Sequence, residues 1–181
     1  RVIFDELQPD NQDAIEALAR IYERTAQWEA LNGVFQRQLD NAHGDVEESE
    51  IRAKMAHLAS ERLNDVDGAI EGWKRVLDLR GEDPEALRAL AHLYEALGRW
   101  SELTDVLERH YDIADSDEDR VHVLSTRARL FDEQLNRDDE ALEQWQRVLD
   151  IDYSNVEALR AIAKIWRRRG DSQELVTALH A

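Results

Sequence analysis

The chain has 181 residues, of which 43% are hydrophobic and 35% are charged, so it is long enough to form one sizeable domain with a buried core. Its formal net charge of −17 opposes binding to a phosphate backbone, and the lack of cysteine excludes disulfides, thiolate chemistry and cysteine-ligated metal sites while leaving the compartment open. No uninterrupted apolar stretch approaches membrane-spanning length, and only two prolines and seven glycines interrupt a composition that favours helix.

Three segments, residues 12–28, 84–100 and 156–172, carry one pattern at a fixed interval of 72 residues. In each segment a small alanine is followed three positions later by an aromatic residue: Ala19 and Tyr22, Ala91 and Tyr94, Ala163 and Trp166. Residues 51–79 and 123–151 match each other at the same interval and add two further alanines. We call these five residues the marker alanines: Ala19, Ala56, Ala91, Ala128 and Ala163. Their spacing of 37, 35, 37 and 35 residues indicates five stacked copies of one supersecondary unit.

Each unit is predicted to consist of two helices with a polar or glycine turn between them. In the third unit apolar residues at i, i+3, i+4 and i+7 define one helical face, and Gly98 then ends the helix before a second apolar face begins. One extra residue precedes the turn of each even unit. The expected helices span residues 12–24, 26–42, 47–63, 66–80, 84–97, 100–114, 118–135, 138–151, 155–169 and 172–180. The small marker residue is expected where the second helix crosses closely over the first.

These residues resemble the tetratricopeptide repeat family, whose repeats combine a large apolar residue, a leucine followed by a small residue, and an aromatic residue with a smaller apolar set in the second helix. The third unit shows this pattern most fully, with Leu87, Leu90, Ala91, Tyr94, Leu103 and Leu107. The even units depart from it, because Arg52 and Arg127 stand where apolar residues are expected and Ala59 replaces the aromatic residue. The resemblance implies an all-α, right-handed α-solenoid of helix-turn-helix repeats.

The repeats are expected at residues 12–45, 46–82, 83–117, 118–154 and 155–181, with residues 1–10 as the tail of a preceding repeat. Because no polar capping helix is evident at the end, we expect the chain to be part of a longer repeat protein. Apolar faces are then expected at both ends, with weak head-to-tail self-association as the consequence. The residues concerned are Val2, Phe4, Leu7, Leu175, Val176 and Leu179.

The residue after each marker alanine is basic or can become so, and the resemblance places these residues in the concave groove of the stack. We call them the basic column: Arg20, His57, His92, Arg129 and Lys164. Near Lys164, the same helix adds Arg160, Arg167 and Arg168 to the candidate groove. One interpretation is a ladder of cations that binds an acidic peptide. The alternative is that the column pairs with acids three or four residues along the same helix, such as Glu23, Glu95, Asp132 and Glu133. The asparagines of the carboxylate-clamp repeats that hold chaperone tails are absent from the first helices.

Other motifs point to structure rather than to chemistry. Tryptophans at repeat-fixed positions, Trp28 with Trp100 and Trp73 with Trp145, are expected in the core rather than in a ligand cage. The acidic run from Asp115 to Asp119 lacks the glycine and closing glutamate of a calcium loop and is interpreted as a solvated loop. The histidines lack metal-binding spacing, and no phosphate loop or nucleophile motif is present. We expect no catalytic residues, no metal and no cofactor.

The sequence therefore predicts a non-catalytic scaffold that binds a protein or peptide, in which an acidic partner fits the basic column. The alternative is a helical-repeat module that binds RNA, which would require a basic groove with a base-reading code. Nucleic acid is not the expected partner because the body is acidic, and an enzyme is a third and weaker interpretation. Twenty arginines against three lysines favour a bacterial source.

Overall fold

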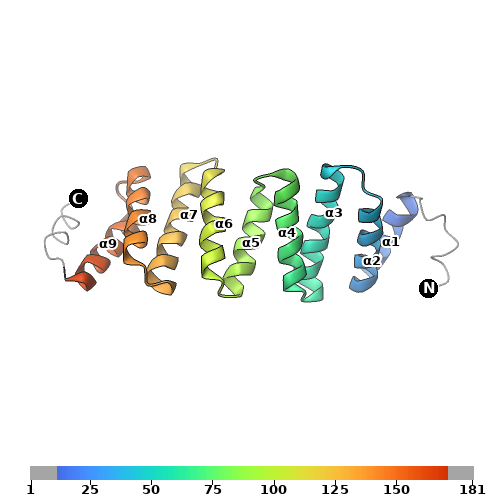
Figure 1. Cartoon of the computed structure of the whole chain (residues 1–181), viewed down its shortest axis with the longest axis horizontal. Coiled ribbons are helices and arrows are strands. Elements are labelled where there is room, and N and C mark those ends of the chain that lie inside the picture. The colour runs from blue at the N-terminus through green and yellow to red at the C-terminus, as the bar shows by residue number, and fades with distance from the viewer. Residues whose placement is uncertain (1–11, 171–181) are drawn as a thin grey trace. The chain divides into compact units, whose positions relative to one another are not determined.

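The computed structural model describes residues 12–170, and this part of the chain is all-α (Figure 1). Its helices are α1 (Gln12–Arg24), α2 (Trp28–Asp40), α3 (Asp45–Leu58), α4 (Val66–Arg80), α5 (Pro84–Ala96), α6 (Trp100–Asp112), α7 (Asp117–Arg129), α8 (Asp138–Ile151) and α9 (Val156–Arg169). Two π-helical segments, Ala59–Leu63 and Leu130–Gln134, extend α3 and α7. The predicted helices agree with these bounds to within two residues. The predicted helix at 172–180 and the apolar ends of the chain lie outside the described residues.

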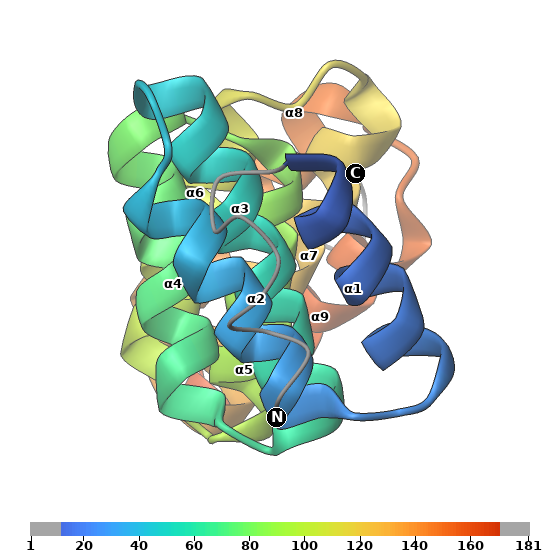
Figure 2. The same ribbon diagram turned by 90° about the vertical axis from the view of Figure 1, so that its right-hand side faces the viewer.

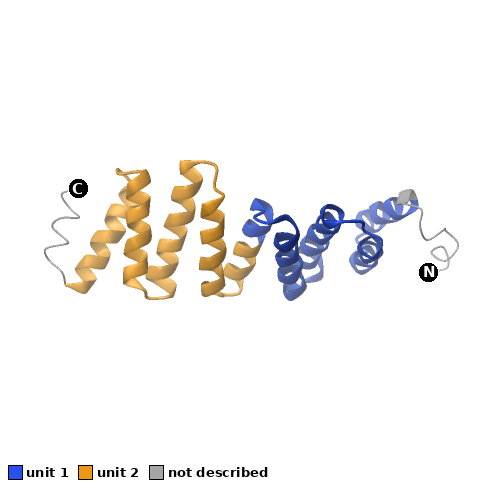
Figure 3. Ribbon diagram, turned by 45° about the horizontal axis from the view of Figure 1, so that its top comes forward, with its two compact units in different colours: residues 1–89 blue, residues 90–181 orange. Residues whose placement is uncertain are grey.

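The chain divides into two compact units, residues 1–89 and residues 90–181 (Figure 3). In the first unit α1 packs against α2, α2 against α3, and α3 against α4, and Figure 2 shows α1 and α2 side by side. In the second unit α6 packs against α7, α7 against α8, and α8 against α9. Within each unit these helices thus contact the helix that follows, as stacked helical hairpins require.

The core of each unit contains a tryptophan from the second helix of an even hairpin. Trp73 on α4 and Trp145 on α8 are each only 1% exposed, which confirms that these repeat-fixed aromatics belong to the core. Trp28 and Trp100, which open α2 and α6, are partly buried. Because one buried aromatic side chain removes a large apolar area from water, each even hairpin gains much of its stability at this position.

The extra residue before each even turn is accommodated by π-helical backbone. In both even hairpins the first helix ends in a five-residue segment with i→i+5 hydrogen bonding, and the chain then turns through a left-handed asparagine. Asn64 and Asn136, at φ 54° and 52°, are 72 residues apart. Asparagine tolerates this conformation better than most residues do, so the sequence permits the turn locally.

The marker alanines lie at close helix crossings in the even hairpins. Ala56 and Ala128 are fully buried, and a β-carbon placed on Gly72 of α4 would lie 2.9 Å from the Cβ of Ala56. This distance leaves no room for a larger side chain on either helix, which confirms the predicted close crossing at this position. Ala19 and Ala91 are partly exposed, so the constraint is weaker in the first and third hairpins, whereas Ala163 on α9 is buried.

Two glycines inside helices of the first unit give a matched test of this packing. Gly33→Ala on α2 has open space around the new methyl group, and alanine favours helix, so this variant should be more stable by about 0.5–1 kcal/mol. Gly72→Ala should be less stable by about 1 kcal/mol or more, because the methyl group meets Ala56. Urea unfolding of the two variants and the wild type measures both effects. A stabilising Gly72→Ala would show that α3 and α4 do not cross closely.

Candidate interaction surface

Two members of the basic column lie in the first unit and have different partners. Arg20 on α1 is 80% exposed, and its Nη2 lies 3.6 Å from Oε2 of Glu16 on the same helix. The Nε2 atom of His57 on α3 lies 3.1 Å from the Oε1 atom of Glu85, which is at the start of α5. The imidazole of His57 also stands edge-on to the ring of Trp73, so its position is fixed from two sides.

The other members lie in the second unit. Arg129 on α7 donates from Nη1 to Oε1 of Glu157 on α9 over 2.9 Å. Lys164 on α9 lies with Nζ 3.3 Å from Oδ2 of Asp132, which is buried in the π-helical segment. His92 on α5 is exposed and has no ion pair within the described range 12–170. His57 also lies 3.6 Å, from Nδ1, from Oε1 of Glu61 four residues along the chain. The paired acids therefore come both from the same helix, as the alternative interpretation expects, and from a neighbouring first helix, although Glu23 and Asp132 are not the partners of Arg20 and Arg129.

The bridges between first helices follow a register. Each joins the residue after one marker alanine to the residue six positions before the next marker alanine. The pairs His57–Glu85 and Arg129–Glu157 are therefore 72 residues apart on both sides. The same register pairs Arg20 with Glu50, but Arg20 contacts Glu16 instead, so α1 and α3 lack the bridge that joins α3 to α5 and α7 to α9.

The basic end of α9 is held by a network of aspartates. Arg168 bridges Asp132, at 2.7 Å, and Asp138, while Arg169 reaches Asp138 and Asp139. Burial alone would raise the pKa of Asp138, but hydrogen bonds from Arg168 and Arg169 outweigh it and hold the pKa below its ordinary value. Two further candidate residues on this helix, Arg160 and Arg167, are exposed and have no ion pair with any described residue.

Arg52 and Arg127, the two arginines that depart from the repeat pattern, each interact with acidic or amide side chains of their own unit. Arg52 donates from Nε to Oε1 of Glu48 over 2.8 Å, and the pKa of Glu48 is lowered by hydrogen bonds from Arg52 and Arg75. Arg127 is mostly buried, contacts Glu108 and donates to Oε1 of Gln144 over 3.0 Å. Both departures are therefore explained by internal pairing.

The acidic run from Asp115 to Asp119 is the start of a helix rather than a solvated loop throughout. Asp117 begins α7, and the Ser116 hydroxyl accepts a hydrogen bond from the backbone N–H of Asp119 as the helix cap. Acidic residues in the first turn also interact favourably with the helix dipole, whose positive end lies at the helix N-terminus. Between residues 12 and 170 no group of three or more histidine, aspartate or glutamate side chains has the arrangement of a metal site.

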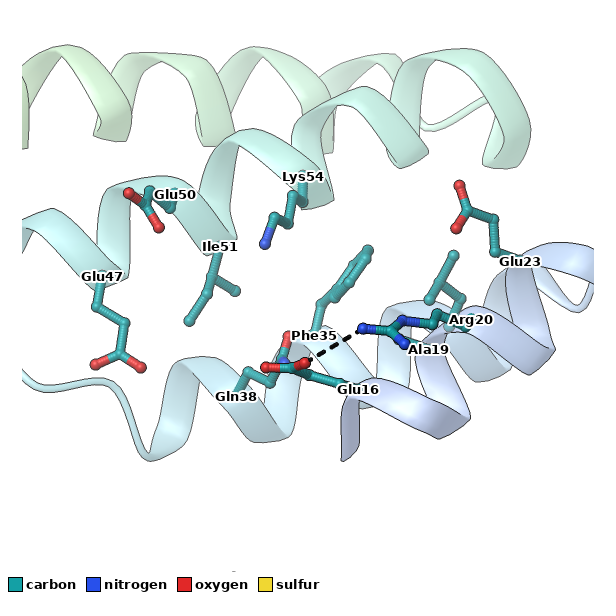
Figure 4. Close-up of a pocket in the computed structure, with 11 residues that line it drawn as sticks. Glu16, Ala19, Arg20, Glu23, Phe35, Gln38, Glu47, Glu50, Ile51 and Lys54 are labelled. Carbon is teal, nitrogen blue, oxygen red and sulfur yellow. Dashed lines mark ion pairs between the residues drawn. The ribbon is translucent and has the colours of Figure 1, made fainter. Parts of the chain in front are cut away.

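An open groove of about 600 Å³ lies in the first unit where the α1–α3 bridge is missing (Figure 4). We call it the α1–α3 groove, and α2 contributes to its floor. It is lined by Glu16, Ala19, Arg20, Glu23, Leu31, Phe35, Gln38, Glu47, Glu50, Ile51 and Lys54. Leu31 and Ile51 are buried and Phe35 is half-buried, so the floor is apolar.

The rim of the α1–α3 groove carries more acids than cations. Four glutamates face two cations, Arg20 and Lys54, which leaves a formal charge of −2. Glu23 and Glu50 have no ion pair among residues 12–170. The Oε1 atom of Gln38 is buried without a hydrogen-bond donor in the same part of the chain. The groove therefore offers apolar contact together with two carboxylates, Glu23 and Glu50, that have no ion pair in the described part of the chain.

Of the groove residues, the sequence pointed only to Arg20. The walls come from α1 and α3, whereas Phe35 and Gln38 come from α2, and no motif links these three helices in the sequence. A usable signal for Glu50 was its position six residues before Ala56, which matches Glu85 before Ala91 and Glu157 before Ala163. Single-helix spacing does not reveal this register.

Comparisons with known proteins agree with the repeat architecture. The family model described as tetratricopeptide repeat matches residues 14–50 and 86–121. The resemblance predicted from the sequence is thus confirmed: the chain contains tetratricopeptide repeats, and its fold class is the all-α solenoid of such repeats. No curated protein matches the sequence. No helix in the range 12–170 combines the length and apolar character needed to cross a membrane.

Several solved structures share this fold. The structure titled as MamA protein aligns with 93% of this chain and 87% of its own length, at 15% identity and a TM-score of 0.58. A tetratricopeptide repeat protein from Parabacteroides merdae ATCC 43184 aligns over 93% and 64%, at 14% identity and a TM-score of 0.61. BtubC from P. vanneervenii aligns over 93% and 76%, at 14% identity and a TM-score of 0.52. At these identities the similarity establishes the fold alone.

The aspartate network on α9 predicts a pH dependence of stability. Because the pKa of Asp138 is lower in the folded chain, its contribution is complete at pH 7 and is lost as the pH falls below about 3.9, the ordinary value for aspartate. Asp138→Asn should lower the free energy of unfolding by about 1 kcal/mol at pH 7 and by less in acid. Urea unfolding between pH 7 and pH 3 measures the difference.

Glu133→Gln, an exposed position in the same unit, is the control and should have little effect at any pH. A loss of stability for Asp138→Asn that is the same at pH 3 as at pH 7 would show that the arginine network does not act through the Asp138 charge.

Proposed function

We propose that this chain is a non-catalytic scaffold that binds a segment of another protein along the first helices of its repeats. Tetratricopeptide repeats generally act as interaction scaffolds, and two segments of this chain match that family. The observation that carries the proposal is the α1–α3 groove, which has an apolar floor and a charged rim along two first helices. An apolar floor with a few polar groups at its edge suits a protein segment that inserts one or two side chains.

An acidic partner for the basic column remains part of the proposal for the second unit. Arg129, Lys164 and Arg168 are already paired with acids of the chain, so a partner there would exchange one carboxylate for another. Arg160 and Arg167 on α9 are exposed and lack such pairs among the described residues, and they are the positions where an acidic segment would gain most. Exposed pairs of this kind contribute little affinity singly and more to the rate of association.

Binding of protein segments rather than RNA is tested by presenting both to the chain under one condition. Random peptides about fifteen residues long and a random single-stranded RNA pool are each selected on the immobilised chain at low salt. We expect peptides to be enriched and RNA to pass through, because the net charge of −17 repels phosphate. Retention of RNA with no enrichment of peptides would contradict the scaffold and favour the RNA-binding alternative.

A further inference from the structure

We propose that the α1–α3 groove binds a basic segment that carries an apolar anchor residue, and that a cation of this partner takes the place that Arg20 leaves empty beside Glu50. This inference rests on the scaffold function and names the partner class for its first unit. It departs from the acidic partner that the basic column suggests, because the groove around Arg20 is itself acidic.

The α1–α3 junction lacks an ion pair that two other junctions have. At two other junctions the basic residue after a marker alanine reaches a glutamate of the next first helix, at 3.1 Å for His57 and 2.9 Å for Arg129. At the α1–α3 junction both residue types are present, yet Arg20 lies 3.6 Å from Glu16. Glu50 is therefore a carboxylate at a bridge position that forms no ion pair with any residue from 12 to 170.

The rim of the groove is predominantly acidic. Figure 4 shows the glutamates arranged around the opening, with Glu23 at one end and Glu47 and Glu50 at the other. Glu47 accepts a backbone hydrogen bond from His43, whereas Glu23 and Glu50 lack a described partner. Lysine or arginine side chains of a bound segment supply both the positive charge and the N–H donors that these carboxylates need.

The floor of the groove selects a segment with an apolar side chain as well. Phe35 is half-buried between buried Leu31 and Ile51, so a leucine, phenylalanine or tryptophan inserted there removes the remaining apolar surface from water. Gln38 lines the same groove, and a side-chain amide is able to exchange hydrogen bonds with the backbone of a bound segment. Free lysine or a purely polar cation would use only part of this surface.

Long-range charge favours the same partner. The chain carries a formal charge of −17, so a basic segment is attracted and an acidic one is repelled before contact. The long side chains of Lys54 and Arg20 are exposed, so their charged ends are able to turn away from an incoming cation. We therefore expect binding to weaken as salt is raised.

The random peptide selection tests the inference through the composition of the enriched peptides. They should be rich in lysine and arginine around one large apolar residue, and the tightest of them should be measured by fluorescence anisotropy. The double variant Glu23→Gln/Glu50→Gln should raise the dissociation constant of this peptide by at least about fivefold. The control is Glu29→Gln/Asp78→Asn, which changes the net charge equally at exposed positions of the same unit outside the groove and should leave the affinity unchanged.

The outcomes separate the two proposals. Enrichment of acidic peptides, or of peptides whose affinity is the same for the groove variant and the control variant, would overturn the inference while leaving the scaffold function intact. Enrichment of no peptide at all would overturn both. A groove variant that melts below the control variant would be replaced by Lys54→Glu, which adds a carboxylate to the rim and should tighten binding of the basic peptide.

Discussion

The close crossing of two helices at small residues is the constraint on which each even repeat depends. A helical hairpin has no core of its own beyond the line where its helices meet, so its stability depends on how closely the backbones approach. At Ala56 and Gly72 that approach admits no additional methyl group, and Trp73 fills the space beside the crossing. In the second unit Gln144 occupies the position equivalent to Gly72, and its side-chain oxygen accepts hydrogen bonds from two arginines instead.

Charges at the surface have a different role from the crossing. The bridges His57–Glu85 and Arg129–Glu157 involve half-exposed side chains, and such pairs contribute at most about 1 kcal/mol each. They do not hold the stack together, so the absence of an equivalent bridge between Arg20 and Glu50 costs little stability. An acidic, apolar-floored groove lies at this junction, and the proposed binding of a basic segment rests on this small electrostatic difference between repeats.

Spacing in the sequence was sufficient to predict the helices but not the contacts between repeats. The 72-residue interval located the marker alanines and the tryptophans, because packing positions recur with the repeat. It indicated one extra residue in each even hairpin, yet residue counts do not reveal that π-helical backbone accommodates it. Glu85 and Glu157, which pair with His57 and Arg129, were missed because they lie 28 residues further on, in the next first helix. Reasoning from i, i+3 and i, i+4 neighbours considers one helix at a time.

We propose that the α1–α3 junction receives a cation from a bound partner. A crystal structure of the chain with its selected peptide would locate this cation. We expect a lysine or arginine nitrogen of the peptide within about 4 Å of the Glu50 carboxylate and an apolar side chain against Phe35. A peptide bound elsewhere, with Arg20 and Glu50 joined to each other as His57 and Glu85 are, would contradict this proposal.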